Sequence, residues 1–93
     1  MEITIQEDST KGYVTARENG ARAGMMTYSK AGDNLIIIDH TDVDPAFGGK
    51  GVGKQMLYKI VEMAREMNIK VIPLCPFAAS LFKKNTDIHD VLN

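Results

Sequence analysis

The spacing of hydrophobic and polar residues divides the chain into a first half of strands and a second half that is mostly helical. Four short segments of the first half either alternate apolar and polar residues or run continuously in apolar residues, as strands do. Turn-forming stretches rich in Gly, Asp and Asn separate them. The predicted strands cover residues 2–6, 12–17, 22–29 and 34–43. Their short connections indicate an antiparallel meander.

The fourth predicted strand, "NLIIIDHTDV", is a continuous apolar run, so we expect a central strand that is covered on both faces. In the segment that follows, apolar residues recur every three or four positions, which predicts an amphipathic helix. Its apolar positions are Val52, Met56, Leu57, Ile60, Val61, Ala64 and Met67. A short strand at residues 70–74, a second helix at 77–85 and a last turn or docked tail at 87–93 complete the chain.

The resulting order is β-β-β-β-α-β-α, which is an α/β (α+β) fold. Residues 34–74 have the length of a crossover unit, so the fourth and fifth strands are expected to be parallel neighbours in an otherwise antiparallel sheet. With 93 residues, no internal repeat and no linker, the chain is expected to form a single domain over residues 1–93.

The stretch "DPAFGGKGVGKQML", Asp44 to Leu57, joins the fourth strand to the first helix. The first N–H groups of a helix lack acceptors and lie at the positive end of its dipole, while glycines let the backbone approach a phosphate. Lys50 and Lys54 add positive charge. The loop is therefore interpreted as an anion site, and the alternative is a glycine-rich turn with solvated lysines.

Two nucleotide-binding motifs fit this loop poorly. Gly48 to Lys54 spells G-x-x-x-x-G-K, but Gln55 stands where a P-loop needs a Ser or Thr hydroxyl for Mg²⁺. The Gly49-x-Gly51 pair is followed by Lys54 where a dinucleotide fingerprint has its third glycine. Neither nucleotide class is favoured.

Charge and cysteine content narrow the class of ligand and the compartment. Residues 1–47 hold four Lys or Arg against eight Asp or Glu, whereas residues 48–93 hold seven against four, so the second half would better receive an anion. The net charge of −1 argues against nucleic acid and membrane partners. A single cysteine, an N-terminus unlike a signal peptide and the lack of a spanning apolar run predict a cytoplasmic protein.

Three segments together resemble the GNAT acetyltransferase superfamily, and in particular its short members. They are "IDHTDV" (Ile38–Val43), "GKGVG" (Gly49–Gly53) and "VIPLCPF" (Val71–Phe77), and the resemblance spans the whole chain. "GGKGVG", from Gly48, occupies the motif [Q/R]-x-x-G-x-[G/A], with Gly48 in place of the long polar residue. The resemblance implies a minimal GNAT fold in which the fourth and fifth strands are parallel and splayed.

The resemblance also implies that acetyl-CoA is the cofactor. The backbone N–H groups of Gly49 to Lys54 would hold its pyrophosphate, and Thr41, Asp42 and Val43 would pair with the pantetheine arm. An N–H near Val43 would polarise the thioester carbonyl. The predicted cofactor-binding set is Thr41, Asp42, Val43, Gly48, Gly49, Lys50, Gly51, Val52, Gly53, Lys54, Cys75, Phe77 and Phe82.

The catalytic residues are less clearly indicated. The superfamily commonly uses a Tyr acid where this chain has Phe82, which carries no proton. Cys75 is the nearest replacement, as an acid or a nucleophile, and its alternative role is that of a small buried hydrophobe. His40 is a candidate general base, with a hydrogen-bonded structural histidine as the alternative. The His, Cys and carboxylate residues show no metal spacing, so no metal is expected.

The expected function is therefore that of an acetyl-CoA-binding N-acetyltransferase that acts on a primary amine of a peptide, protein or small molecule. A chain this short leaves little room for a substrate lobe, so the acceptor site should be open, and the protein is expected to be a monomer or a weak homodimer. One alternative is a non-catalytic acyl-CoA or CoA-binding module. The other is a phosphate- or nucleotide-binding protein without acyl chemistry.

Overall fold

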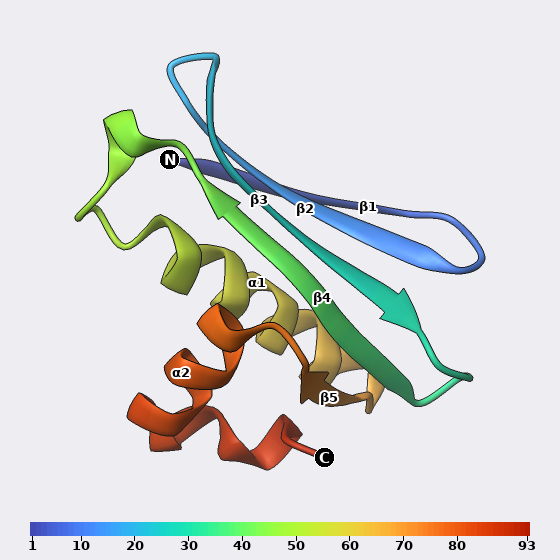
Figure 1. Ribbon diagram of the computed structural model, residues 1–93. Coiled ribbons are helices and arrows are strands. Elements are labelled where there is room, and N and C mark those ends of the chain that lie inside the picture. The colour runs from blue at the N-terminus through green and yellow to red at the C-terminus, as the bar shows by residue number, and fades with distance from the viewer.

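A single five-stranded sheet in the order β1-β2-β3-β4-β5 organises the molecule, as the computed structural model of residues 1–93 shows (Figure 1). The first four strands are antiparallel and β4 pairs with β5 in parallel, as the sequence predicts. This pairing confirms the expected α/β class and topology. The strands are β1 (Glu2–Glu7), β2 (Lys11–Glu18), β3 (Ala21–Lys30), β4 (Leu35–Val43) and β5 (Lys70–Pro73).

The helices follow the predicted order, with one short addition. They are the 3-10 turn η1 (Pro45–Phe47), α1 (Val52–Met67), α2 (Pro76–Lys84) and the 3-10 helix η2 (Thr86–Val91). The helix α1 begins after Gly51 and ends before Asn68, and both flanking residues adopt left-handed backbone angles, with φ of 72° and 56°. The turn η1 was not predicted, because three residues are too few to show a period. Neither α-helix combines the length and the apolar character needed to cross a bilayer.

One hydrophobic core lies between a single face of the sheet and the helices. It contains 20 buried residues, among them Met26 and Ile38 from the sheet, Ile60 from α1 and Phe82 from α2. The C-terminal η2 packs beside α1, and an ion pair joins them: Arg65 Nη2 lies 2.8 Å from Asp90 Oδ1. Both α-helices therefore lie in one layer, below the sheet in Figure 1.

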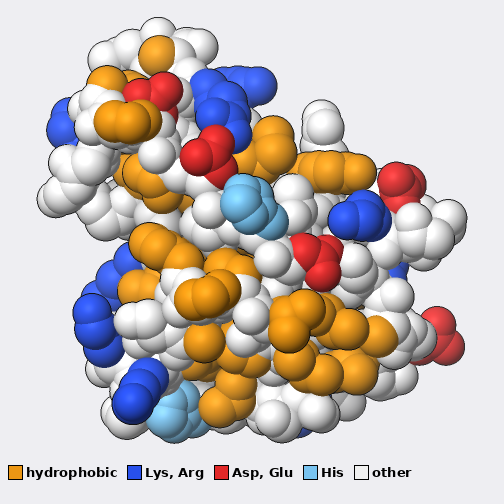
Figure 2. All heavy atoms as spheres, in the orientation of Figure 1, with side chains coloured by type: hydrophobic (Ala, Val, Ile, Leu, Met, Phe, Trp, Pro, Cys, Tyr) orange, Lys and Arg blue, Asp and Glu red, His pale blue; other side chains and the backbone are white.

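The opposite face of the sheet carries no helix, which corrects the expectation that β4 would be covered on both sides. Leu35 and Ile37 on that face are only half-buried, whereas Ile36 and Ile38 on the core face are 2% and 0% exposed. Figure 2 shows hydrophobic side chains gathered over β5 and the start of β4. The apolar run therefore reflects an interior strand, paired with both β3 and β5, and not a second covering layer.

A bulge in β4 changes which side chains face the helices. Tyr28 pairs with Ile38 but Thr27 pairs with His40, so Asp39 is an extra residue in the ladder. An extra residue reverses the alternation of faces beyond it. Thr41 consequently lies on the core face and is half-buried, whereas His40 lies on the opposite face and is exposed.

The parallel pair β4–β5 splays apart beyond the bulge. Its pairing ends at Ile38 and Pro73, and the N–H groups of Leu74 and Cys75 both donate to the Ile38 carbonyl at 3.1 Å. The chain then turns away into α2, while β4 continues to Val43. The edge of β4 from residue 39 to 43 that faces away from β3 thus has no partner strand.

Candidate functional site

Unpaired backbone N–H groups gather where the glycine loop enters α1. Gln55 N–H makes the first bond of the helix, to the Gly51 carbonyl at 3.0 Å. The N–H groups before it that have no acceptor in the protein belong to Gly49, Gly51, Val52, Gly53 and Lys54. Two further loop N–H groups are used locally, since Gly48 donates to Pro45 O at 3.2 Å and Lys50 to Phe47 O at 3.4 Å. We call the five unpaired groups the cradle; unpaired donors at the start of a helix favour an anion.

Glycine is required in the cradle for its backbone angles. Gly49 and Gly51 have φ of 80° and 72°, and no atom lies within 4 Å of the position of a Cβ at either residue. A side chain there would therefore be strained by the left-handed backbone, with open space around it.

A hollow of about 360 Å³ opens beside the cradle, between the start of α1, the end of β4 and the start of α2. Eight of the predicted cofactor-binding residues line it: Val43, Gly48, Gly49, Gly51, Val52, Gly53, Lys54 and Phe77. The remaining lining residues, which sequence reasoning missed, are Asp44, Pro45, Phe47 and Leu81. Leu81 was detectable, because it lies four residues after Phe77 on the same helix and thus on the same side. The others belong to η1 or to its cap.

The open edge of β4 reaches this site at Val43, which lines the hollow. Asp44 N–H donates to Ala23 O at 2.9 Å, and Val43 lies opposite Gly24. In an antiparallel ladder the residue next to such a donor directs its own N–H away from the neighbouring strand. The N–H of Val43 therefore points into the gap between β4 and β5, where the sequence predicts the donor to a thioester carbonyl.

Cys75 lies at the inner end of the gap, where it caps α2. Its Sγ accepts a hydrogen bond from Ala78 N–H at 3.3 Å, and the Thr41 Oγ1 atom lies 3.3 Å from the same sulfur. Cys75 is 6% exposed. The structure thus brings together Thr41 and Cys75, which both belong to the predicted cofactor-binding set, and of which Cys75 is also a catalytic candidate.

The candidate general base, His40, is on the opposite face of β4. Asp42 shares that face, and its carboxylate accepts a bond from Arg22 at 3.0 Å. The structure therefore does not bring His40 and Cys75 to one side of the sheet; they flank the gap from its two faces. No group of three His, Cys, Asp or Glu side chains is arranged to hold a metal.

The two aromatic residues of α2 have different surroundings. Phe77 is 44% exposed and its ring covers Gly53 so closely that a Cβ there would lie 2.2 Å from ring carbons. Phe82 is 2% exposed, belongs to the core and does not line the hollow. Phe82 occupies the predicted position of the missing acid and offers no polar atom there.

Lys50 in the loop and Lys54 in the first turn of α1 each contact an aromatic ring. Lys50 Nζ lies 5.4 Å from the centre of the Phe47 ring, and Lys54 Nζ lies 5.5 Å from that of Tyr58. Such cation–π contacts are compatible with a second, anionic partner, because the ring occupies only one side of the ammonium group. The loop thus presents fixed N–H donors together with two positive side chains.

A sheet that splays at its one parallel pair, with a glycine-rich helix start beside the gap, defines the GNAT class of α/β folds. Comparison with protein families agrees: the model of the GCN5-related N-acetyltransferases matches residues 12–91. The chain belongs to this family.

Individual relatives give the same result. A GCN5-like protein from Staphylococcus aureus is 40% identical, with 97% of this chain and 87% of that chain covered and a TM-score of 0.72. Human protein NATD1 is 24% identical over 84 residues, which are 89% of this chain and 74% of NATD1. A Clostridium acetobutylicum protein described as a predicted acetyltransferase, solved with acetyl-CoA, shares the fold at 20% identity and a TM-score of 0.64, with 81% and 56% covered.

Proposed function

We propose that this protein binds acetyl-CoA at the cradle and transfers the acetyl group to a primary amine. One observation carries the proposal: five N–H groups without an acceptor in the protein, of Gly49, Gly51, Val52, Gly53 and Lys54, lie in the segment that leads from the open end of β4 into α1. A pyrophosphate supplies the acceptors that such a set of donors lacks. Membership in the family and the acetyl-CoA complex of the Clostridium acetobutylicum relative support the same cofactor.

The pantetheine arm and thioester would continue from the cradle along β4. In this proposal the N–H of Val43 donates to the thioester carbonyl and stabilises the negative charge that develops there during attack. Acetyl-CoA supplies the activated acetyl group. The protein supplies the donors, the phosphate site and the exclusion of water by Phe77 and Leu81.

In this proposal Cys75 lies near the thioester and can take either of two roles in the transfer. As an acid, its S–H gives a proton to the departing CoA thiolate and regains one from the acylated amine. As a nucleophile, its sulfur takes the acetyl group while its proton goes to CoA; an amine then takes the acetyl group and returns a proton to the sulfur. His40, on the exposed face, is the proposed base for an amine that approaches from that side.

The first test is calorimetric titration of the protein with acetyl-CoA, CoA and ATP. We expect acetyl-CoA and CoA to bind and ATP to bind at least about tenfold more weakly. Gly49→Ala should weaken acetyl-CoA binding about five- to thirtyfold, because the left-handed backbone costs a side chain about 1–2 kcal/mol. Gly20→Ala is the matched control, since Gly20 also has positive φ and open space but lies in the β2–β3 turn.

Equal losses in the Gly49→Ala and Gly20→Ala variants would show that strain elsewhere, and not the cradle, governs binding. Tight ATP binding without CoA binding would favour the nucleotide-binding alternative.

A second candidate function is that of an acyl-CoA-binding module without catalysis, which the buried, acid-free Phe82 favours. A time course of thioester loss with a panel of peptide and small amines separates the two functions. We expect amine-dependent loss, and at least about a tenfold slower rate in Cys75→Ala. Binding without any amine-dependent turnover would favour the module. Intact mass after incubation with acetyl-CoA then distinguishes the two roles of Cys75, because only the nucleophile adds one acetyl group.

A further inference from the structure

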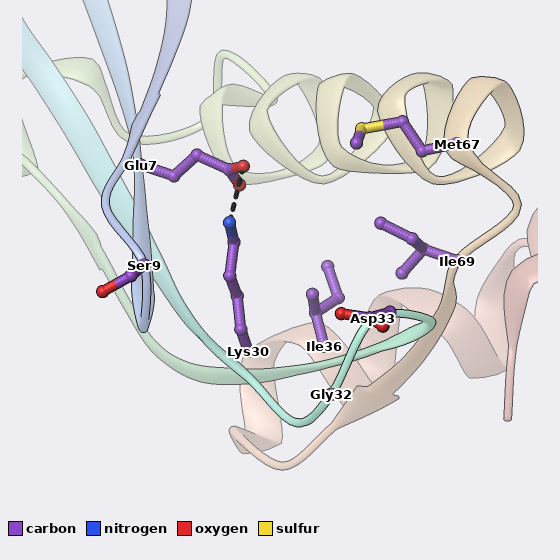
Figure 3. A pocket seen from close by; sticks show the side chains of 8 residues that line it. All are labelled: Glu7, Ser9, Lys30, Gly32, Asp33, Ile36, Met67 and Ile69. Carbon is purple, nitrogen blue, oxygen red and sulfur yellow. Dashed lines mark ion pairs between the residues drawn. The ribbon is translucent and has the colours of Figure 1, made fainter.

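A second hollow of about 380 Å³ lies at the other end of the sheet from the cradle. It is bounded by the last turn of α1, the end of β1 and the turn between β3 and β4 (Figure 3). It shares no lining residue with the first hollow. Its volume is within the range of small-molecule sites.

One side of this second hollow is apolar, and Met67 is its exposed part. Ile36 and Ile69 point into it in Figure 3 and are 2% and 9% exposed. Met67, the last residue of α1, lies above them and is 57% exposed. An aliphatic chain laid against these three side chains would be removed from water, at about 0.8 kcal/mol per buried CH₂ group.

The charges around the hollow leave one carboxylate unpaired. Lys30 Nζ lies 2.8 Å from Glu7 Oε1, and Tyr28 donates its hydroxyl to Glu7 Oε2. The hydrogen bonds from Lys30 and Tyr28 lower the pKa of Glu7, so this carboxylate stays charged and balances Lys30. Asp33, on the β3–β4 turn, has neither an ion-pair nor a hydrogen-bond partner in the protein. The C-terminal end of α1, with the negative end of its dipole, meets the same hollow.

We propose that this hollow binds a small organic cation with an aliphatic chain, of the primary alkylammonium class. The ammonium group lies toward Asp33, and the chain lies against Ile36, Ile69 and Met67. A cation fits because the lining carries one uncompensated negative charge. This hollow shares no lining residue with the hollow beside the cradle, so the proposal does not depend on acetyl transfer.

The test is NMR titration of the whole protein with n-butylammonium chloride, 1-butanol and sodium butyrate, in the absence of CoA. We expect saturable shifts for n-butylammonium at the Met67 methyl group and at the amides of Ile36 and Ile69. Binding of 1-butanol should be at least about fivefold weaker, and butyrate should not bind. Saturable binding of butanol or butyrate at equal strength would overturn the choice of a cation, and no saturable shift at these residues would overturn the site.

Two variants test the geometry. Asp33→Asn removes the unpaired carboxylate from an exposed turn and should weaken n-butylammonium binding at least about threefold. Glu2→Gln removes the same charge from an exposed position on β1 and should leave the affinity unchanged. Met67→Lys places a cation at the exposed wall and should abolish binding. Affinity that is unchanged in both Asp33→Asn and Met67→Lys would overturn the proposal.

Discussion

The two halves of β4 belong to one strand but have different surroundings. From Leu35 to Ile38 the strand is paired on both edges, with β3 and with β5, and its core side chains are almost fully buried. From Asp39 to Val43 it is paired with β3 alone, and no side chain is fully buried. The first half closes the sheet, and the second half leaves hydrogen-bonding groups available to a ligand.

Two local features produce this difference. The extra residue Asp39 reverses the faces of the strand, so that Thr41 meets Cys75 and His40 meets solvent. The chain of β5 then leaves the sheet at Cys75, where Pro76 begins α2 with the backbone angle that suits a first helical residue. A strand can thus be extended beyond its partner as an unpaired edge without a change in its own secondary structure.

The largest expected effect comes from the paired half. Ile38→Ala should lower the free energy of unfolding by about 2–5 kcal/mol, because it leaves a cavity beneath a fully buried side chain. Val43→Ala, in the unpaired half, should cost less than half as much, because Val43 is only half-buried. Urea denaturation followed by circular dichroism measures both. Similar losses for the two variants would show that the halves do not differ in their contribution to stability.

Much of this arrangement could be predicted from the sequence, because it depends on periodicity. The strand order and the bounds of α1 follow from apolar spacing, and the glycine loop is recognisable from its composition. The bulge was not predictable, because "DHTD" consists of four polar residues whose pattern assigns no residue to either face. The contact between Thr41 and Cys75 depends on this bulge and on the turn into α2, so it appears only when the two strands are placed together.

A smaller effect is expected where the two segments meet. Thr41→Val removes the hydroxyl that lies 3.3 Å from Cys75 Sγ and keeps the shape of the side chain. We expect Thr41→Val to lower the free energy of unfolding by about 0.5–1.5 kcal/mol. Thr41→Ser keeps the hydroxyl and should have nearly the stability of the parent. The same two variants also test whether Thr41 contributes to the reaction as well as to stability. If Thr41 positions the sulfur of Cys75, thioester turnover falls in Thr41→Val and is restored in Thr41→Ser. Equal stability and turnover in all three proteins would show that this contact contributes nothing.

The smallest effect concerns the end of the sheet beside the paired half, where Lys30 lies opposite Ile36 and pairs with Glu7. The hydrogen bonds from Lys30 and Tyr28 lower the pKa of Glu7 in the folded protein. A lowered folded-state pKa stabilises the protein above the unfolded-state pKa, and this stability is lost as the pH falls through the folded-state value. Glu7→Gln should therefore cost up to about 1 kcal/mol at neutral pH, because the pair is partly exposed.

The pH dependence distinguishes this ion pair from a packing effect. The difference in unfolding free energy between the parent and Glu7→Gln should be constant above about pH 5 and should close as the pH falls below about 4. Urea denaturation at a series of pH values measures it, with Glu2→Gln as the matched control that shows little difference throughout. A difference that persists undiminished at pH 3 would mean that Glu7 acts through its packing against Tyr28. In that case the contribution of Glu7 to the free energy of unfolding would come from burial and not from its charge.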